Sequence, residues 1–561
     1  MKLRTPRGFQ DIMLEEAELR ESVCRDVGDY FAASGYRLIE TPVAERMEVL
    51  SAGFSDETSP LIDDAFRFVD VDGELLALRS DVTLPIARVV ATRFDQIEGP
   101  YRLRYCTDVF REQEALRGQP RELKQLGIEL LDAQGLASDF EIIKLAVGGL
   151  DAANLCDFTL NVNNVALFLE CIAAVERNSD EGDSKVWQQS VIAAAHRGDF
   201  VAVRNLCDEI SMSEALKSCI TTLPFLRGGK EVLEEARQLI EAAQAQRALI
   251  ILDDLCALYE ACRAAGFDKR ITVDMSLMPD LNYYTGLVFE IYSVFGALSL
   301  GGGGRYDRMA ELLGRPMPGA GFAFNVGRLV GALRAQADDI RVRDNERIKI
   351  AIPKGSLFED SLQLLEEAGF DIALLRNAKR QLRIETDELD VIIAKPTDVA
   401  IYVANGAVDC GIGGKDILLE ANYPLLELVD LRYGSCSFVV AQPKSETMTL
   451  AQRAIEQGLV RVATKYPRIT SQFFDEQGIQ AEIVKLNGNI ELAPLIGIAD
   501  VIVDITSTGT TLRENNLEPL NDVMNISARF VANAASARSN PRISQLAKRL
   551  YDLTKEGSSC N

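Results

Sequence analysis

The residues best suited to chemistry lie in one run towards the C-terminal end, VIVDITSTGTTLREN at 501–515. Its apolar part predicts a strand that ends at Asp504. The residues that follow are small or carry hydroxyls: Thr506, Ser507, Thr508, Gly509, Thr510 and Thr511. In a turn that leads into a helix, such residues direct backbone N–H groups and hydroxyls at one point, where the helix dipole also favours an anion. The pattern predicts a phosphate site, with Asp504 placed to accept hydrogen bonds from ribose hydroxyls.

A plainer alternative is a threonine-rich turn that only caps the following helix. The run is not a Walker A loop, because no Gly-Lys-Ser or Gly-Lys-Thr follows it. If it holds a phosphate, the ligand is therefore bound in another way than in the P-loop proteins.

The single histidine, His196, excludes several kinds of catalytic site. A zinc site built from several histidines cannot form, and no HExxH helix is present. A Ser-His-Asp triad is not expected, because His196 lies in AAAHRGDF, a pattern typical of a helix end at the surface.

Acidic residues outnumber basic ones by 84 to 60, which gives a formal net charge of -24. A broad basic surface for nucleic acid is not expected, because phosphate contacts need clustered Lys and Arg. Local basic pockets for a small phosphorylated ligand are compatible with this balance.

The chain of 561 residues is 47% apolar, enough for several hydrophobic cores. Eleven cysteines occur singly, without a CxxC pair, which is typical of reduced thiols in the cytosol. The start has no apolar core of a signal peptide, and no apolar run reaches a membrane-spanning length. We expect a soluble, cytoplasmic protein without a membrane partner.

The elements that position these residues fall into two halves, 1–340 and 346–555, with a boundary expected near residue 340. The first half predicts helices at 12–34 and 137–150, the second with Ser138 and Glu141 in capping-box spacing. It also predicts strands at 101–106, 125–131 and 285–294. Residues 186–266 are rich in Ala, Leu and Glu and are expected to form a helical insertion.

The second half alternates between strand and helix patterns, as in a βαβ series. This rhythm predicts a mostly parallel sheet covered on both faces. The expected elements are 348–353, 357–368, 390–394, 396–405, 408–412, 460–464, 467–477, 481–486 and 501–505. Pro467 is expected in the first turn of the helix at 467–477.

The second half resembles the short form of ATP phosphoribosyltransferase, the first enzyme of histidine biosynthesis, from about Arg347 to Leu553. The motifs that carry the resemblance are IAIPKGSL at 350–357, PTDVAIYVANGAVDCGIGGKD at 396–416, ATKYPRIT at 463–470 and KLNGNIELAPLIGIADVIVDITSTGTTLREN at 485–515. The family implies transfer of the phosphoribosyl group of phosphoribosyl pyrophosphate (PRPP) to N1 of ATP, with Mg²⁺ and release of pyrophosphate. It also implies two α/β lobes like those of type II periplasmic binding proteins, with the site in the cleft.

Carried onto this chain, the resemblance assigns Asp504 to the PRPP ribose and Ser507–Thr511 to its 5′-phosphate. It places Glu491 beside that site. Lys354, Arg380 and Lys395 would face ATP or pyrophosphate, and Lys465 and Lys485 are further basic candidates. No metal-ligating side chain is expected with this reading, so the Mg²⁺ would be carried by the substrates.

Two positions depart from the family pattern. Ser356 stands where the family usually has Arg after Lys-Gly, and Lys395 stands where it usually has Arg. Lysine keeps the charge but lacks the bidentate fork that suits phosphate, so slower turnover is one expectation.

Residues 1–335 resemble the class II catalytic core of histidyl-tRNA synthetase and, more closely, the regulatory subunit that accompanies short transferases. The resemblance rests on GFQDIM at 8–13, LRSDVTLPIAR at 78–88, YCTDVFREQEA at 105–115, RELKQLGIELL at 121–131, NYYTGLVFEIY at 282–292, GGGGRYD at 301–307 and GAGFAFNVGRL at 319–329. It implies an antiparallel sheet flanked by helices and at least a dimer.

A histidine pocket is implied by the same match, because carboxylates and amides suit an amino group and an imidazole while Arg suits a carboxylate. The residues that correspond are Asp81, Thr83, Arg111, Gln125, Glu129, Tyr283 and Tyr284. Each of them has the alternative role of tying the sheet together. Met278-Pro279-Asp280-Leu281-Asn282 lacks the catalytic arginine expected before the tyrosine pair, and Gly327 replaces a glutamate beside Arg328. A working tRNA synthetase is therefore not expected.

Together the halves predict a fused ATP phosphoribosyltransferase whose first half senses histidine, as a homo-oligomer that binds ATP and PRPP and no nucleic acid. Two alternatives stay open: a non-catalytic histidine or nucleotide sensor, and a synthetase-like amino-acid activator.

Overall fold

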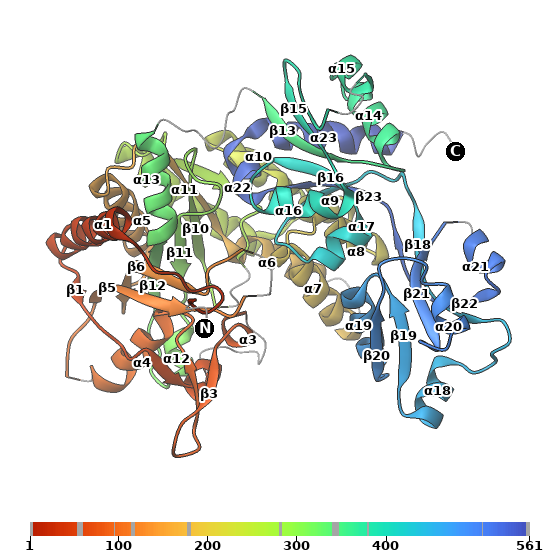
Figure 1. Cartoon of the computed structure of the whole chain (residues 1–561). Helices are drawn as coiled ribbons and strands as arrows, with labels where there is room; N and C mark the ends of the chain where they lie inside the picture. The colour runs from red at the N-terminus through yellow and green to blue at the C-terminus, as the bar shows by residue number, and fades with distance from the viewer. Residues whose placement is uncertain are drawn as a thin grey trace. The chain divides into compact units, whose positions relative to one another are not determined.

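The computed structural model describes residues 4–52, 60–94, 96–113, 118–176, 181–279, 283–338, 347–377, 381–507 and 509–556. The chain divides into two compact units, Met1–Asp344 and Asn345–Asn561 (Figure 1). The predicted boundary near residue 340 falls at positions 339–346, outside the described residues. Within the described parts of the chain, no helix is long and apolar enough to cross a membrane.

The first unit is built on a nine-stranded sheet in the order β1-β5-β6-β12-β11-β10-β7-β9-β8. Its strands are β1 (Arg37–Leu38), β5 (Tyr101–Phe110), β6 (Glu122–Leu131), β7 (Phe158–Asn164), β8 (Arg227–Gly228), β9 (Ile271–Asp274), β10 (Leu287–Ser293), β11 (Gly301–Arg305) and β12 (Gly319–Asn325). The β1–β5 and β7–β9 pairs are parallel, and the other neighbours run antiparallel. The strands predicted at 101–106, 125–131 and 285–294 are confirmed as β5, β6 and β10.

A small antiparallel sheet, β2-β4-β3, accompanies the large one. It consists of β2 (Ala44–Arg46), β3 (Arg67–Val69) and β4 (Leu75–Leu78). Short helices adjoin both sheets: α2 (Met47–Ala52), α3 (Pro60–Asp63), α4 (Thr83–Arg93) and α12 (Met309–Leu312).

Three long helices cover one face of the nine-stranded sheet: α1 (Leu14–Ala33), α5 (Gly135–Ala152) and α13 (Val326–Ala337) (Figure 1). Phe31 of α1 lies with its ring centroid 5.8 Å from that of Phe322 and 6.4 Å from that of Phe324, both on β12. Successive strand residues point to opposite faces, so the residues between these phenylalanines face the other way. The second face therefore carries Ala323, which packs against a separate hydrophobic cluster that includes Leu103 and Tyr105.

The capping box predicted for Ser138 and Glu141 is wrong. Helix α5 begins at Gly135, after Gln134, and no side chain caps it. Glu141 instead accepts two hydrogen bonds from Arg102, at 2.7 and 2.8 Å, and one from Tyr36 at 2.8 Å. Sequence spacing indicated a local bond, but Arg102 of β5 and Tyr36, which precedes β1, bind the carboxylate instead.

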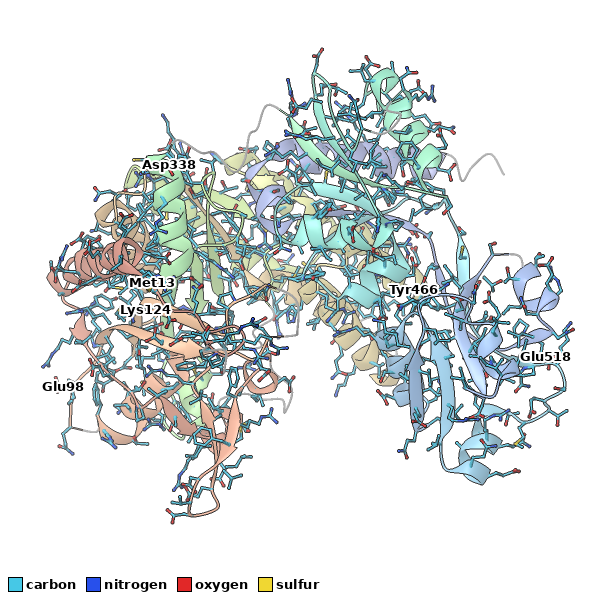
Figure 2. All side chains as sticks on the ribbon, in the orientation of Figure 1. Met13, Glu98, Lys124, Asp338, Tyr466 and Glu518 are labelled. Carbon is cyan, nitrogen blue, oxygen red and sulfur yellow. The ribbon has the colours of Figure 1, made fainter. Side chains whose placement is uncertain are left out.

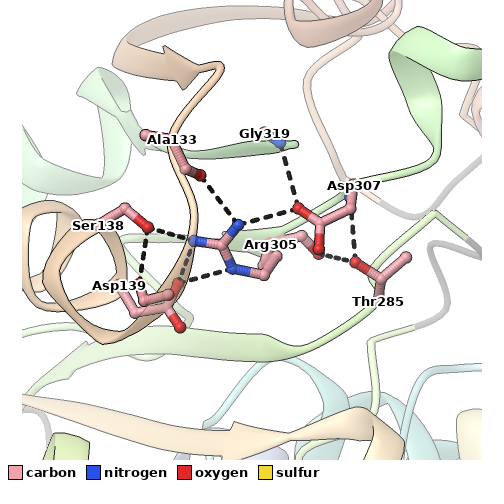
Figure 3. A network of polar contacts seen from close by, with 8 residues as sticks. Ala133, Ser138, Asp139, Thr285, Arg305, Asp307 and Gly319 are labelled. Carbon is pink, nitrogen blue, oxygen red and sulfur yellow. Dashed lines mark hydrogen bonds and ion pairs between the residues drawn. The ribbon is translucent and has the colours of Figure 1, made fainter. Parts of the chain in front are cut away.

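Ser138 belongs to a polar network centred on Arg305, the last residue of β11 (Figure 3). The Arg305 guanidinium donates to Ser138 Oγ at 2.5 Å, to Asp139 Oδ1 at 2.8 Å and to Asp307 Oδ1 at 2.9 Å. The Asp307 carboxylate in turn accepts from the backbone N–H of Gly319 at 3.3 Å. These bonds tie β11 to α5 and fix the end of the glycine-rich strand.

The region predicted as a helical insertion at 186–266 is mostly helical. Its helices are α7 (Glu181–His196), α8 (Phe200–Glu209), α9 (Glu214–Thr222), the 3₁₀ turn Leu223–Phe225, α10 (Lys230–Ala242) and α11 (Gln246–Ala264). They pack on one another and on α6 (Val165–Glu176). One detail differs from the prediction, because β8 joins the edge of the nine-stranded sheet by pairing with β9. His196 ends α7, as expected, and is half-buried.

The second unit contains two sheets, of order β14-β15-β13-β16-β23-β17 and β20-β19-β21-β18-β22. The first comprises β13 (Ile348–Pro353), β14 (Arg383–Glu385), β15 (Leu389–Ala394), β16 (Cys410–Gly414), β17 (Leu426–Asp430) and β23 (Ala528–Ala532). The second comprises β18 (Cys436–Pro443), β19 (Val460–Thr464), β20 (Ala481–Lys485), β21 (Val501–Thr506) and β22 (Leu517–Ile526).

The helices of this unit are α14 (Phe358–Glu367), α15 (Ala373–Arg376), α16 (Pro396–Ala404), α17 (Lys415–Ala421), α18 (Leu450–Gln457), α19 (Pro467–Glu476), α20 (Leu492–Leu495), α21 (Thr510–Glu514), α22 (Ala534–Ser539) and α23 (Pro541–Glu556). All nine predicted elements of this half are present, and Pro467 opens α19 as predicted.

The mostly parallel pairing predicted for this half is wrong, because both of its sheets are mixed. Each sheet has a parallel centre, where β13 pairs with β15 and β16, and β19 pairs with β20 and β21. Antiparallel strands complete both sheets, among them β18, β22 and β23. The βαβ rhythm revealed only the parallel centres, because the returning strands carry no alternation with helices.

The chain passes twice between these two sheets. It first leaves β17 for β18 through residues 431–435, and it returns from β22 to β23 through Ser527 alone. The two passages are hydrogen-bonded together, since the Leu431 N–H donates to the Ala528 carbonyl at 2.9 Å and the Ala528 N–H donates to the Tyr433 carbonyl at 2.9 Å.

Candidate functional site

Asp504 lies near the carboxyl end of β21, where only 9% of its surface is exposed. Its Oδ1 accepts from the backbone N–H of Ile505 at 2.9 Å. Burial raises the pKa of Asp504, against the opposing effects of this N–H and of Lys465, and the charges of Glu491 and Asp416 raise it further. A buried carboxylate with unused acceptor capacity at a strand end suits hydroxyl donors such as those of ribose.

The polar turn after Asp504 is compact and open to solvent. Thr506 Oγ1 accepts from the Gly509 N–H at 2.9 Å, which closes the turn, and Gly509 has a left-handed φ of 67° that favours glycine. Ser507, Thr510 and Thr511 are exposed, and α21 begins at Thr510. Thr508 lies outside the described residues.

Arg513 is a cation of this turn to which the sequence analysis gave no role. Its guanidinium donates to Thr510 Oγ1 at 3.2 Å, so it lies beside the exposed hydroxyls. The signal was its position three residues after Thr510, which places both side chains on one side of a helical turn.

Lys465 and Lys485 lie at the same edge of the five-stranded sheet as Asp504. Lys465 follows β19, and its Nζ is 3.9 Å from Asp504 Oδ2. Lys485 ends β20, which pairs in parallel with β19, and both lysines are exposed. Glu491 precedes α20 and is half-buried. The carboxyl ends of parallel strands thus bring two cations and two carboxylates to one edge.

Lys354 and Lys395 form a second basic edge, on the six-stranded sheet. Each directly follows one of two parallel strands, β13 and β15, whose last residues Pro353 and Ala394 are register partners. The Lys354 N–H donates to the Ala394 carbonyl at 2.8 Å, and both lysine side chains are exposed. Ser356 is exposed beside them, and Arg380 lies outside the described residues.

Asp416 connects the two sheets, and sequence reasoning assigned it no role although it ends the GGKD part of a family motif. It lies in the first turn of α17, only 8% exposed, and burial raises its pKa. Its Oδ2 accepts from the hydroxyl of Tyr466 at 3.1 Å, and Tyr466 follows Lys465 directly. The structure therefore brings Asp416 into electrostatic range of Asp504.

In the first unit, Glu129 is the centre of a buried polar cluster on the face of the nine-stranded sheet opposite α1. Only 1% of it is exposed. Its Oε1 accepts from Thr83 Oγ1 at 2.7 Å, and its Oε2 accepts from the hydroxyl of Tyr306. Burial raises the pKa of Glu129 to about 8, although these donors and Tyr105 lower it.

Tyr283, Tyr284 and Asp81 complete the cluster. The ring centroids of Tyr283 and Tyr284 lie 4.6 Å apart, and Tyr283 meets Tyr306 edge to face at 5.9 Å. Asp81 accepts from the Leu84 N–H at 3.1 Å, and burial raises its pKa. The charge of Asp81 also raises the pKa of Tyr284, after burial itself, which places them close together.

Two glycines make room for these side chains. A Cβ at Gly321 would lie 2.1 Å from Glu129 Oε2, and a Cβ at Gly304 would lie 2.9 Å from the ring of Tyr284. Any larger residue would push the cluster apart. Strands β11 and β12 therefore lie directly beneath the polar cluster and leave room for Glu129 and Tyr284.

Arg111 and Gln125 lie at the margin of this cluster. The Arg111 Nε donates to the Ser80 carbonyl at 3.0 Å, and Arg111 lowers the pKa of Asp81 after burial has raised it. The Gln125 Oε1 is buried and has no hydrogen-bond partner. Residues 280–282 of the segment 278–282, which lacks the synthetase arginine, lie outside the described residues.

Comparison with known proteins now identifies both units. The histidyl-tRNA synthetase family matches residues 8–329, and the ATP phosphoribosyltransferase family matches residues 395–552. An ATP phosphoribosyltransferase of Moorella thermoacetica is 48% identical over 200 residues, which cover 35% of this chain and 87% of that protein. An ATP phosphoribosyltransferase regulatory subunit of the same organism is 34% identical over 332 residues, which cover 59% of this chain and 82% of that subunit.

One solved structure extends the likeness to the fold. It is described as an ATP phosphoribosyltransferase regulatory subunit/histidyl-tRNA synthetase from Bacillus halodurans, with a TM-score of 0.53 and 27% identity. The match covers 70% of this chain and 92% of that one.

The chain belongs to the histidyl-tRNA synthetase family in its first unit and to the ATP phosphoribosyltransferase family in its second. It is a fusion in one chain of two parts that Moorella thermoacetica has as separate proteins, and its second unit is a pentosyltransferase.

Proposed function

We propose that this chain transfers the phosphoribosyl group of PRPP to N1 of ATP and releases pyrophosphate, the first step of histidine biosynthesis. The observation that carries the proposal is the edge formed by Asp504, Lys465 and the exposed hydroxyls of the following turn. A carboxylate for ribose, a cation and an anion-binding turn lie together there, as a phosphoribosyl donor requires.

In this proposal, the ribose hydroxyls of PRPP donate to Asp504, and the 5′-phosphate lies against Thr506–Thr511. Glu491 borders the ribose from α20. Lys354 and Lys395 bind phosphates of ATP or of the leaving pyrophosphate from the other sheet, together with Arg380. Two sheets, each with a parallel centre, are compatible with two lobes of the periplasmic-binding-protein kind.

The chemistry needs little proton transfer. Displacement at C1 of the ribose passes through a state with positive charge on the sugar ring, while negative charge grows on the pyrophosphate. Lysines at the strand edges stabilise the departing pyrophosphate, and Asp504 fixes the ribose relative to the attacking base. The lack of a histidine at this edge is therefore no obstacle.

Mg²⁺ is the cofactor that we expect, bound mainly through substrate phosphates. Mg²⁺ usually binds one or two carboxylates and keeps phosphate and water ligands. The described residues contain no cluster of three or more metal-ligating side chains that would form a closed site. When bound, the ion neutralises phosphate charge.

The first unit, we further propose, binds histidine and inhibits the transferase through it. Asp81, Thr83, Glu129, Tyr283 and Tyr284 surround one polar site. The Arg111 guanidinium is suited to the carboxylate of histidine. The Gln125 Oε1, which has no hydrogen-bond partner, is suited to accept from an N–H group of histidine. Coupling of about 1–3 kcal/mol between two such sites is enough for feedback, and a symmetric homo-oligomer is the expected assembly.

The test is pyrophosphate release from ATP, PRPP and Mg²⁺ with and without histidine. We expect release that histidine suppresses. Asp504→Ala should abolish release and leave histidine binding by calorimetry unchanged, whereas Arg111→Ala should relieve inhibition and keep basal release. Release by Asp504→Ala at the parent rate would refute the site, and no release from the parent chain would favour a sensor without turnover.

A further inference from the structure

Helices α17 and α19 belong to different sheets of the second unit but contact each other. Helix α17 follows β16 of the six-stranded sheet, and α19 follows β19 of the five-stranded sheet. Figure 2 labels Tyr466, which directly precedes α19. This contact joins the two substrate-facing edges by side chains, in addition to the two passages of the main chain.

Two carboxylates of α17 make the contact. Asp416 and Glu420 are four residues apart, so they lie on one face of the helix. Asp416 accepts from the Tyr466 hydroxyl at 3.1 Å. Glu420 Oε2 accepts from the backbone N–H groups of Arg468 at 3.1 Å and Ile469 at 3.3 Å.

Glu420 thereby supplies a cap that α19 itself lacks. The first N–H groups of any helix have no partner within the helix, and Tyr466, the residue at the N-cap of α19, provides no side-chain acceptor. A carboxylate suits this position because it also interacts with the positive end of the helix dipole. The first turn of α19 is thus completed from the opposite sheet.

The segment held in this way carries Lys465. Thr464 Oγ1 donates to the Val503 carbonyl at 2.8 Å and accepts from the Tyr466 N–H at 3.0 Å, so the segment is also fixed to β21 beside Asp504. Lys465 lies between these anchors, with its Nζ 3.9 Å from Asp504 Oδ2. The backbone around Lys465 is therefore held by Thr464 on the five-stranded sheet and by Asp416 and Glu420 from the helix that follows the six-stranded sheet.

Helix α17 is anchored in turn at the return passage between the sheets. The Lys415 N–H donates to the Ser527 carbonyl at 3.1 Å, and Lys415 Nζ lies 2.5 Å from Glu427 Oε2. Arg529 holds the same Glu427 at 2.8 Å. An ion triad of half-buried Lys415 with buried Glu427 and Arg529 thus fixes the start of α17, and α17 transmits that position to the first turn of α19.

We propose that Asp416 and Glu420 are positioning residues for the transferase, which hold Lys465 against Asp504 and thereby set the affinity for PRPP. The inference rests on the proposed phosphoribosyl site. It adds that part of the PRPP site is held by the sheet that carries Lys354 and Lys395, so the five-stranded sheet alone does not complete it.

The test compares the Michaelis constants for PRPP and ATP in variants of the full chain. Glu420→Ala should raise the KM for PRPP about tenfold and leave that for ATP within about twofold, because a displacement of about 1 Å at a reacting group has large effects. Glu420→Gln should restore most of the affinity, since its carbonyl oxygen still accepts from both N–H groups. Glu476→Ala, at the exposed last turn of α19, is the matched control and should change neither constant.

Tyr466→Phe provides a second variant that removes one hydroxyl and keeps the buried ring. It should raise the KM for PRPP in the same direction. In a Lys465→Ala background, Glu420→Ala should have less than about twofold further effect, because its influence passes through Lys465. A purely structural role would instead lower the melting temperature and leave the ratio of the Michaelis constants for PRPP and ATP unaltered.

The outcomes separate the inference from the proposed function. If Asp504→Ala releases pyrophosphate at the parent rate and Lys465→Ala leaves the KM for PRPP unchanged, the proposed site itself is wrong. If Asp504→Ala abolishes release and Lys465→Ala raises the KM for PRPP, but Glu420→Ala and Tyr466→Phe do not raise it, only the positioning role is refuted. An equal rise in both Michaelis constants, or a Glu420→Ala effect that persists in full without Lys465, also refutes it.

Discussion

The carboxyl group of Glu129 should make the first unit less stable as the pH rises from neutral to alkaline values. Burial raises its pKa from 4.5 to about 8, because water is excluded and Asp81 is also acidic. The folded chain therefore keeps a proton on Glu129 that the unfolded chain releases at lower pH. The stabilising contribution is complete below the unfolded pKa and is lost as the pH rises through the folded one.

Linkage gives the size of this effect. With these two pKa values, the free energy of unfolding falls by about 3 kcal/mol between about pH 6 and about pH 9 on account of Glu129 alone. Glu129→Gln removes the titrating proton and keeps the shape of the side chain. Its free energy of unfolding, relative to that of the parent chain, should therefore rise by this amount over the same interval.

Trp187 makes the measurement specific for the first unit. It is the one tryptophan of the chain, and it lies 5% exposed on α7. Its fluorescence is recorded during urea unfolding of the parent chain and of Glu129→Gln across the pH interval. The two free energies of unfolding are then subtracted at each pH, which cancels the contributions of the other titrating groups. A difference that stays constant within about 0.5 kcal/mol would show that Glu129 remains charged in the fold, and the reasoning from burial would be refuted.

Three further changes have expected outcomes. Lys395→Arg restores a bidentate donor at the basic edge and should raise kcat/KM for the phosphoribosyl transfer severalfold in a pyrophosphate-release assay; an unchanged or lower value would contradict a phosphate contact there. Gly321→Ala puts a Cβ 2.1 Å from Glu129 Oε2, so it should destabilise the first unit by about 1–3 kcal/mol and abolish histidine inhibition. Unaltered inhibition would contradict a histidine site at Glu129. Glu141→Gln weakens the paired bonds from Arg102 and should cost about 1 kcal/mol in urea unfolding, whereas no change would assign the anchoring of α5 to Arg305 instead.

The strand edges were the part of the site most accessible from sequence. Lys354, Lys395, Lys465 and Asp504 each follow or end an apolar run, and parallel pairing brings such ends to the same edge of a sheet. Local pattern alone singled out Asp504, whereas Lys354, Lys395 and Lys465 were assigned through the family resemblance.

Contacts between distant segments were not accessible in this way. Asp416 and Glu420 read as ordinary acidic residues of a helix, because their partners lie about fifty residues further along the chain. The capping box at Ser138 failed for the same physical reason, since Arg305 competes for its hydroxyl from another element. Local spacing states which bonds are available, and only the fold determines which of them form.

The two passages of the main chain between the sheets of the transferase unit determine how those sheets can move. One passage is the single residue Ser527, which spans only about 3.8 Å between neighbouring Cα atoms, and the other is hydrogen-bonded to Ala528 beside it. Moving the two sheets apart by translation would break both passages, but rotation about the two passages would not. The paired passages are therefore a pivot. Helix α17 begins beside it, because the Lys415 N–H donates to the Ser527 carbonyl, so its contact with α19 opposes rotation of one sheet against the other.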